Sequence, residues 1–247
     1  MIKYEPFKQF IYMETYNSPF NAAGDGRSLA QQVSSVMRRV YFKMTLGLIV
    51  TAFISMWCAD SMTYLTYMSQ HPGMMWVLML VEIGLVIGLS AGINKLSSAV
   101  ASLLFYAFAA VNGLALAPIF LIYTGSTIAT TFFVTAGTFA AMSVYGYFTS
   151  NDLSRMGSIL FMALIGLVIA TIVNLFLHSE TMMWIITYAG VLIFVGLTAW
   201  DTQQVKQMAM QMGGATDGRL ATLGALTLYL DFINLFLYLL RIFGNRD

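Results

Sequence analysis

Three carboxylate residues stand inside stretches that are otherwise strongly apolar: Glu82, Asp201 and Asp231. Asp231 lies near the middle of LTLYLDFINLFLYLLRIFGN (226–245), which is apolar enough to cross a bilayer. Ionisable groups in hydrocarbon are costly unless they are paired or wetted, so they are rare there and usually functional. Two carboxyl groups that meet in such a place share a proton, and their oxygens also suit a hard divalent cation such as Ca²⁺. The chemistry open to these residues is therefore proton sensing, cation binding or both.

The segment around Asp231 carries one polar face when it is read as a helix. Thr227, Asp231, Asn234, Tyr238 and Arg241 follow one another at spacings of four, three, four and three residues, which places them on one side. A lipid-facing helix would not hold such a stripe, so this face must point into protein or water. Because the other faces are Leu, Phe and Ile, the helix fits the centre of a bundle. The uncharged polar members could line an ion path or simply hydrogen-bond to neighbouring helices.

Asp201 stands about one helical turn before the polar end of the preceding apolar segment, in GLTAWDTQQVK. Thr198 and Gln204, three residues to either side, share its helical face. One loop joins this segment to the last one, and Asp231 lies about eleven residues, or ~16 Å, into that last helix. The two aspartates can therefore meet if the helix of Asp201 continues past the membrane edge. A pair that shares a proton would loosen as the pH rises, unless a cation replaces the proton.

Glu82 lies in VLMLVEIGLVIGLSAG, beside Gly84, Gly88 and Gly92 at intervals of four residues. Such a ridge of small residues permits close helix packing. Glu82 itself either pairs with a polar group of a neighbouring helix or lines an ion path.

The composition of the chain decides which class of protein must position these groups. The chain has 247 residues, of which 59% are hydrophobic and 9% charged, against roughly 25% charged in an ordinary soluble domain. A soluble fold could not hide so much apolar surface, so the protein is integral to the lipid bilayer. Twelve Lys and Arg against eleven Asp and Glu provide no basic face for a nucleic-acid partner. Protein partners are not indicated by any motif.

Seven segments are long and apolar enough to cross a bilayer as helices, and they predict an all-α membrane domain over residues 35–247. Continuous apolar runs are not the ten-residue alternation of a membrane barrel. The polar breaks are short, so successive spans must be antiparallel neighbours. Residues 1–34 are predicted to form a polar tail. The predicted spans are 41–60, 74–94, 97–122, 127–148, 157–177, 182–205 and 220–243.

Lys and Arg residues lie on one side of the predicted bundle. They precede the first span and follow the second, fourth and sixth, whereas the breaks after the first, third and fifth contain none. The positive-inside rule then places the N-terminus in the cytoplasm. Arg241 and Arg246 do not fit this pattern, which leaves open a last segment that crosses incompletely.

Both aspartate segments resemble a known family. GLTAWDTQQVK and GALTLYLDFINLFLYLLRIFGN, with AAVNGLALAPIFLIYT and AAMSVYGYFTSNDLS, resemble the bacterial branch of the transmembrane Bax inhibitor motif family over about residues 35–246. The resemblance implies six helices packed around a central C-terminal helix, and a passive, pH-sensitive calcium leak in the bacterial inner membrane. By this resemblance, Asp201 and Asp231 correspond to the two gating aspartates of the family. Glu82 corresponds to the family's acidic residue in the second helix.

The resemblance also implies a basic residue near the cytoplasmic end of the second helix that can lock the aspartate pair. Ile93 stands at that position here, and Lys95 is the candidate substitute. On this interpretation Ca²⁺ is a transported ion with Asp201 and Asp231 as transient ligands. No resident cofactor is expected, and we expect a monomer.

Other functions are also compatible with carboxylates at mid-membrane. A proton-coupled transporter could use them as a relay, and a non-conducting regulator could use a structural aspartate pair while acting through protein partners. An intramembrane aspartyl protease needs GxGD where residues 228–231 read LYLD, so we do not expect an enzyme. A retinal-binding protein needs a lysine in its last span, and this span has none.

Overall fold

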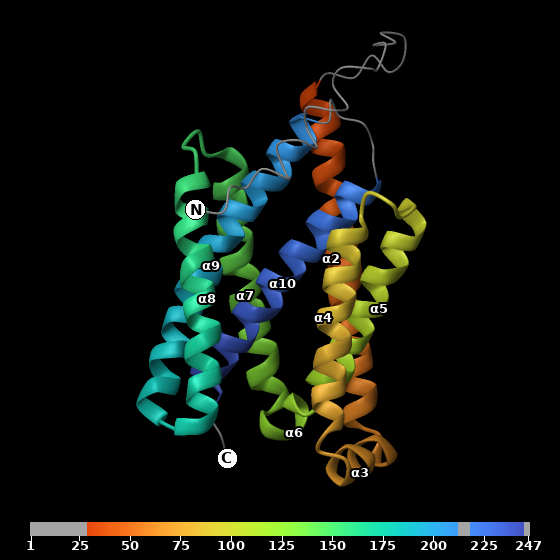
Figure 1. Cartoon of the computed structure of the whole chain (residues 1–247), viewed down its shortest axis with the longest axis vertical. Coiled ribbons are helices and arrows are strands. Elements are labelled where there is room, and N and C mark those ends of the chain that lie inside the picture. Colours follow the sequence, from red (N-terminus) through yellow and green to blue (C-terminus); the bar gives the residue numbers. More distant parts are fainter. Residues whose placement is uncertain (1–28, 212–217, 245–247) are drawn as a thin grey trace.

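The computed structural model describes residues 29–211 and 218–244, and within these ranges the secondary structure is helical (Figure 1). The helices are α2 (Leu29–Ala59), α3 (Met62–Gln70), α4 (Met74–Gly92), α5 (Ser98–Leu116), α6 (Ile119–Ile122), α7 (Gly125–Phe148), α8 (Ser154–Leu177), α9 (Glu180–Gln211) and α10 (Gly218–Phe243).

Seven stretches of the described chain are long and apolar enough to span a membrane, which confirms the predicted all-α architecture. One of them, Ser98–Ile122, combines α5 and α6. The two helices separate at Pro118 because proline lacks an N–H and its ring clashes with the preceding helical turn.

Two helix ends and one extra helix differ from the predicted pattern. The chain after α2 forms the short helix α3, whose first turn is capped by the Ser61 side chain accepting a hydrogen bond from the Tyr64 N–H. α2 begins at Leu29, within the segment assigned to the tail, whereas residues 1–28 of that tail lie outside the described residues. α9 continues to Gln211, beyond the predicted end at residue 205. This continuation is the condition under which Asp201 and Asp231 can meet.

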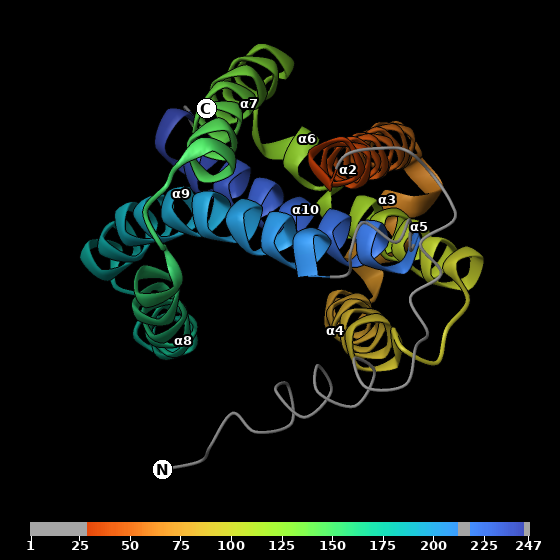
Figure 2. The ribbon, with the colours of Figure 1, turned by 90° about the horizontal axis from the view of Figure 1, so that it is seen from above.

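α10 lies at the centre of the bundle. In the most apolar 18-residue stretch of α10, 67% of the residues are buried. The corresponding stretches of α4 and α8 are each only 6% buried. α10 packs against α9, α2, α7, α5 and α4, and Figure 2 shows it running through the middle of the helices. α8 packs against α9 at the periphery. The prediction of a central C-terminal helix is therefore confirmed.

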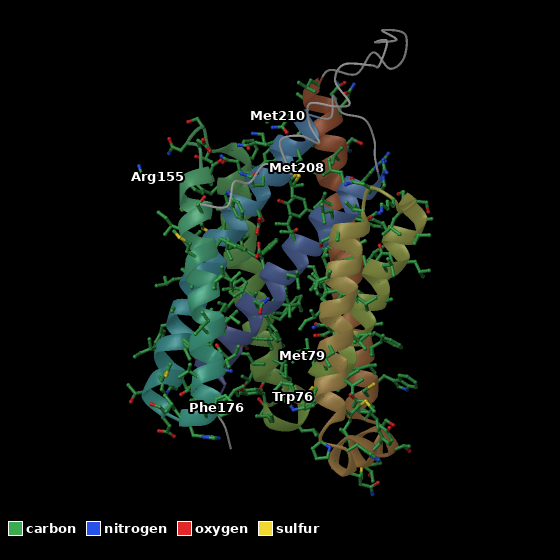
Figure 3. The ribbon with its side chains drawn as sticks, viewed as in Figure 1. Trp76, Met79, Arg155, Phe176, Met208 and Met210 are labelled. Carbon is green, nitrogen blue, oxygen red and sulfur yellow. The ribbon has the colours of Figure 1, made fainter. Side chains whose placement is uncertain are left out.

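The outer surface is apolar along its length and basic at one end. Trp76 on α4 and Phe176 on α8 are 59% and 81% exposed, as suits side chains that meet lipid (Figure 3). Arg155 lies at the end of the bundle where α9 finishes. We call this the basic end, since it also carries the cations of α2, of the turn after α4 and of the start of α10: Arg38, Arg39, Lys43, Lys95 and Arg219.

Candidate functional site

Asp201 and Asp231 are brought together where α9 crosses the central helix. Asp231 is only 4% exposed, and its neighbours on α10 form part of the apolar core. Asp201 is partly buried on the facing side of α9. The two carboxyl groups lie within hydrogen-bonding reach of each other. A hydrogen bond between them requires a proton on one of the two groups, because ionised carboxylates only accept hydrogen bonds.

One oxygen of this pair has no hydrogen-bond partner among the described residues. Oδ2 of Asp231 is buried and receives no N–H or O–H from the described residues. A buried acceptor without a donor costs about 1–3 kcal/mol. A proton held between the carboxyls, or a cation beside them, would remove that cost. The pair is therefore chemically suited to taking up one or the other.

Ala199 and Trp200, just before Asp201, are packed directly on two neighbouring helices. A Cβ at Gly146 on α7 would collide with the carbonyl oxygen of Ala199, and one at Gly157 on α8 would collide with the indole of Trp200. Only glycine allows so close an approach. These contacts fix the position at which α9 presents Asp201.

The stretch just after Asp201 is tied to the turn between α7 and α8. The Gln203 side chain accepts a hydrogen bond from the Leu153 N–H at 2.9 Å and donates to the Asn151 carbonyl at 2.8 Å. Lys206 Nζ donates to the Tyr147 carbonyl at 2.6 Å. Gln203 and Lys206 were not predicted as part of the site, although polar side chains within two helical turns of Asp201 were the available signal.

The structure places Lys95 away from the aspartates. Lys95 is exposed in the turn after α4, and the described residues contain no ion pair between it and Asp201 or Asp231. Lys206 is bonded to the Tyr147 carbonyl, as above, and Arg241 donates to Thr187 Oγ1 at 3.4 Å near the opposite end. A locking role for Lys95 stays a prediction.

Glu82 belongs to a second polar cluster, on another side of α10. Asn112 Nδ2 on α5 donates to Glu82 Oε1 at 3.0 Å. The Tyr229 hydroxyl on α10 donates to Asn112 Oδ1 at 3.0 Å and lies 2.6 Å from Thr51 Oγ1 on α2. The cluster therefore links α4, α5, α10 and α2. Asn112 and Tyr229 were not predicted as site residues, although Tyr229 stands two residues before Asp231.

The remaining predicted residues of the α10 polar face lie against protein. Tyr238 stacks on Phe194 of α9, with ring centroids 5.9 Å apart. Arg241 reaches Thr187 of the same helix, as noted above. Asn234 Nδ2 donates to the Leu230 carbonyl within α10. The expectation that this face points inward agrees with these positions, and the contacts of Tyr238 and Arg241 favour helix packing as their role.

A closed metal site is not formed by the described residues, among which no three His, Cys, Asp or Glu side chains gather around one point. Ca²⁺ in proteins takes six to eight oxygen ligands. The two aspartates could therefore hold Ca²⁺ only together with water or carbonyl oxygens.

Comparison with known proteins identifies the family. The family model described as "Inhibitor of apoptosis-promoting Bax1" (Bax1-I) matches residues 33–247. The chain belongs to the Bax inhibitor-1 family. The match includes both aspartates of the pair and all seven spans except the first four residues of the first span.

Bacterial relatives of this Bax inhibitor-1 family chain extend over most of its length. It is 51% identical over 217 residues to the inner membrane protein YbhL of Escherichia coli, covering 87% of this chain and 93% of the relative. It is 38% identical over 235 residues to an uncharacterized protein of Rickettsia prowazekii, covering 95% and 99%. An uncharacterized protein of Borreliella burgdorferi is 42% identical over 212 residues, covering 85% and 91%. The chain is thus an integral membrane protein with full-length bacterial relatives.

Proposed function

We propose that this protein is a passive calcium leak of the bacterial inner membrane, opened and closed by the proton shared between Asp201 and Asp231. The observation that carries the proposal is the close approach of the two carboxyls inside the bundle, with one buried oxygen of Asp231 left without a donor among the described residues. The inner-membrane location is supported by the name of the Escherichia coli relative. The positive-inside rule places the basic end, and with it the start of α2, in the cytoplasm.

The proposed gate follows from the charge of the pair. With one proton between them, the carboxyls attract each other and hold α10 against α9. When that proton leaves, two like charges face each other at low dielectric, where their repulsion is much stronger than in water. Separation of α9 and α10, or entry of a cation between the carboxylates, relieves the repulsion. Rising pH therefore opens the path, and Ca²⁺ is the ion that the carboxylate oxygens favour.

Calcium flux into liposomes that contain the purified full chain tests this proposal. We expect the influx to rise between pH 6 and pH 8 in the absence of any other solute gradient. Asp201→Asn and Asp231→Asn should each remove the pH dependence, because the remaining carboxylate then has no like charge to repel and accepts a hydrogen bond from the amide at every pH. Asp152→Asn is the matched control, since Asp152 is exposed in the turn before α8. Hydrogen bonds from the Ser154 side chain and N–H lower the pKa of Asp152, so it stays ionised throughout this range.

Two other results would overturn the leak. Flux that requires a gradient of a second solute would identify a proton-coupled transporter. A well-folded protein that passes no calcium at any pH would indicate a non-conducting regulator that acts through protein partners. Equal flux and equal pH dependence in the wild type and both aspartate variants would exclude the pair as the gate.

A further inference from the structure

Two polar side chains of the central helix, Tyr229 and Asp231, attach it to neighbouring helices and stand two residues apart. Asp231 reaches Asp201 on α9, and Tyr229 reaches Thr51 on α2 and Asn112 on α5. Residues i and i+2 of an α-helix point about 200° apart. α10 is therefore held from nearly opposite sides at one level of the bundle. A shift of one attachment must change the geometry of the other.

The position of the Tyr229 hydroxyl is set by close packing. Tyr229 is completely buried. Its ring meets Phe105 and Phe108 edge-on, with centroids 5.7 and 5.5 Å away. A Cβ at Gly47 would come within 3.4 Å of the ring from α2. Because packing prevents rotation of the ring, a change in the hydrogen bonds of the hydroxyl acts on α10 itself.

Asn112 connects this hydroxyl with Glu82, and its amide has one donor end and one acceptor end. In the structure Nδ2 faces Glu82 and Oδ1 accepts from Tyr229, which suits an ionised Glu82. A protonated Glu82 can instead donate to Oδ1 of Asn112. The amide would then turn its Nδ2 toward Tyr229, whose own proton would have to point to Thr51. Protonation of Glu82 thus permits a second direction of the hydrogen bonds that reach α10.

Few other charges are available in this part of the bundle. α5 and α7 contain no Asp, Glu, Lys or Arg. Toward Glu82, α5 presents Asn112 and α10 presents Tyr229, while Asp201 of α9 faces Asp231. Lys43 of α2 is bonded near the basic end to Ser102 and Thr222, at 2.6 Å each. Glu82 and the aspartate pair are therefore the acidic groups placed on the two sides of α10.

We propose that Asn112 and Tyr229 are positioning residues that couple Glu82 to the aspartate pair, so that protonation of Glu82 changes how readily Asp231 parts from Asp201. The inference rests on the proposed gate and adds a second acidic group to its control. It requires the hydrogen-bonded chain, since a purely electrostatic effect of Glu82 would pass through space without Asn112 or Tyr229.

Infrared difference spectroscopy of the purified full chain tests the coupling without any measurement of calcium. The carboxylic-acid band of the pair is assigned by its loss in Asp231→Asn and is followed from pH 5 to pH 9. Glu82→Gln imitates protonated Glu82, and we expect it to move the midpoint of the band to lower pH by about half a pH unit. In a Tyr229→Phe background the same Glu82→Gln change should move the midpoint by less than half as much, because the phenyl ring keeps the packing but not the hydroxyl.

Two further variants keep this test decisive. Asn112→Leu retains the volume of the side chain without its amide, so it should also suppress the shift, and it serves if Tyr229→Phe fails to fold. Tyr64→Phe is the matched control. It removes a hydroxyl that donates to the Leu114 carbonyl of α5 at 2.7 Å, so the full shift should remain.

The coupling is overturned if Glu82→Gln leaves the midpoint unchanged in the wild-type background. It is also overturned if the shift is equal with and without the Tyr229 hydroxyl, since Glu82 would then act through space. A midpoint shift that depends on Tyr229, in a protein that passes no calcium, would support the coupling and reject the leak. Failure of the two proposals is therefore distinguishable.

Discussion

Asp201 on α9 and Asp231 on α10 meet carboxyl to carboxyl in the core of the helix bundle. The helix that carries Asp201 is fixed by close glycine contacts to α7 and α8, and the helix that carries Asp231 is surrounded on most sides. A change in the charge of the pair must therefore alter the contact between α9 and α10, because both helices are tightly packed on their other sides.

The thermal stability of the protein should depend on pH through this pair. At low pH the shared proton joins the carboxyls. As the pH rises and that proton leaves, the repulsion between them destabilises the packed state. We expect the melting temperature in detergent to fall from pH 6 to pH 8 without Ca²⁺. In Asp231→Asn the fall should disappear, because the amide can donate to Asp201 at every pH. Asp152→Asn should behave like the wild type, and a parallel fall in Asp231→Asn would contradict the idea of a shared proton.

Gly146→Ala should destabilise the bundle next to the pair. The added Cβ collides with the Ala199 carbonyl, which is backbone and cannot turn away. Overpacking of this kind costs about 1–3 kcal/mol, which a thermal-shift assay in detergent would register as a lower melting temperature. Gly137→Ala, on the same helix, has nothing within 4 Å of its new Cβ and should be neutral or slightly stabilising. Equal effects of the two changes would contradict the close approach of α7 to α9.

Gln203→Leu should release the turn between α7 and α8. The change removes the bonds to Leu153 and Asn151 and leaves a buried N–H without an acceptor, at a cost of about 1–3 kcal/mol. Hydrogen–deuterium exchange of residues 149–153 should become faster. Gln211→Leu, exposed at the end of α9, is the control and should leave that exchange unchanged. Unaltered exchange in Gln203→Leu would show that the turn is held by other contacts.

Lys95→Gln tests whether Lys95 locks the aspartate pair. The side chain is exposed and forms no ion pair with either aspartate, so we expect the pH profile of calcium influx to stay the same. If Lys95 locked the pair, its loss would move the midpoint of the profile by about half a pH unit or more. Liposome flux from pH 6 to pH 8, compared with Arg155→Gln at the same end, would decide between these outcomes.

Several properties of this protein follow from its sequence alone because they depend on local physical requirements. A helix must supply about 20 apolar residues to cross the bilayer, so the seven spans can be counted along the chain. Helical periodicity places Asp231, Asn234, Tyr238 and Arg241 on one face. Since lipid does not solvate such a face, its inward orientation and the central place of α10 could also be predicted.

Only the tertiary structure decided which polar groups meet. Asp201 reaches Asp231 because α9 crosses α10 where a glycine of α7 admits the Ala199 backbone and a glycine of α8 admits the Trp200 side chain. Neither helix crossings nor close approaches are local properties of a segment. Glu82 likewise finds Asn112, and through it Tyr229, because α4, α5 and α10 are neighbours in space. Short loops make successive helices antiparallel, but they do not determine which distant helices share a side of the central one. That choice rests on side-chain packing across the whole bundle.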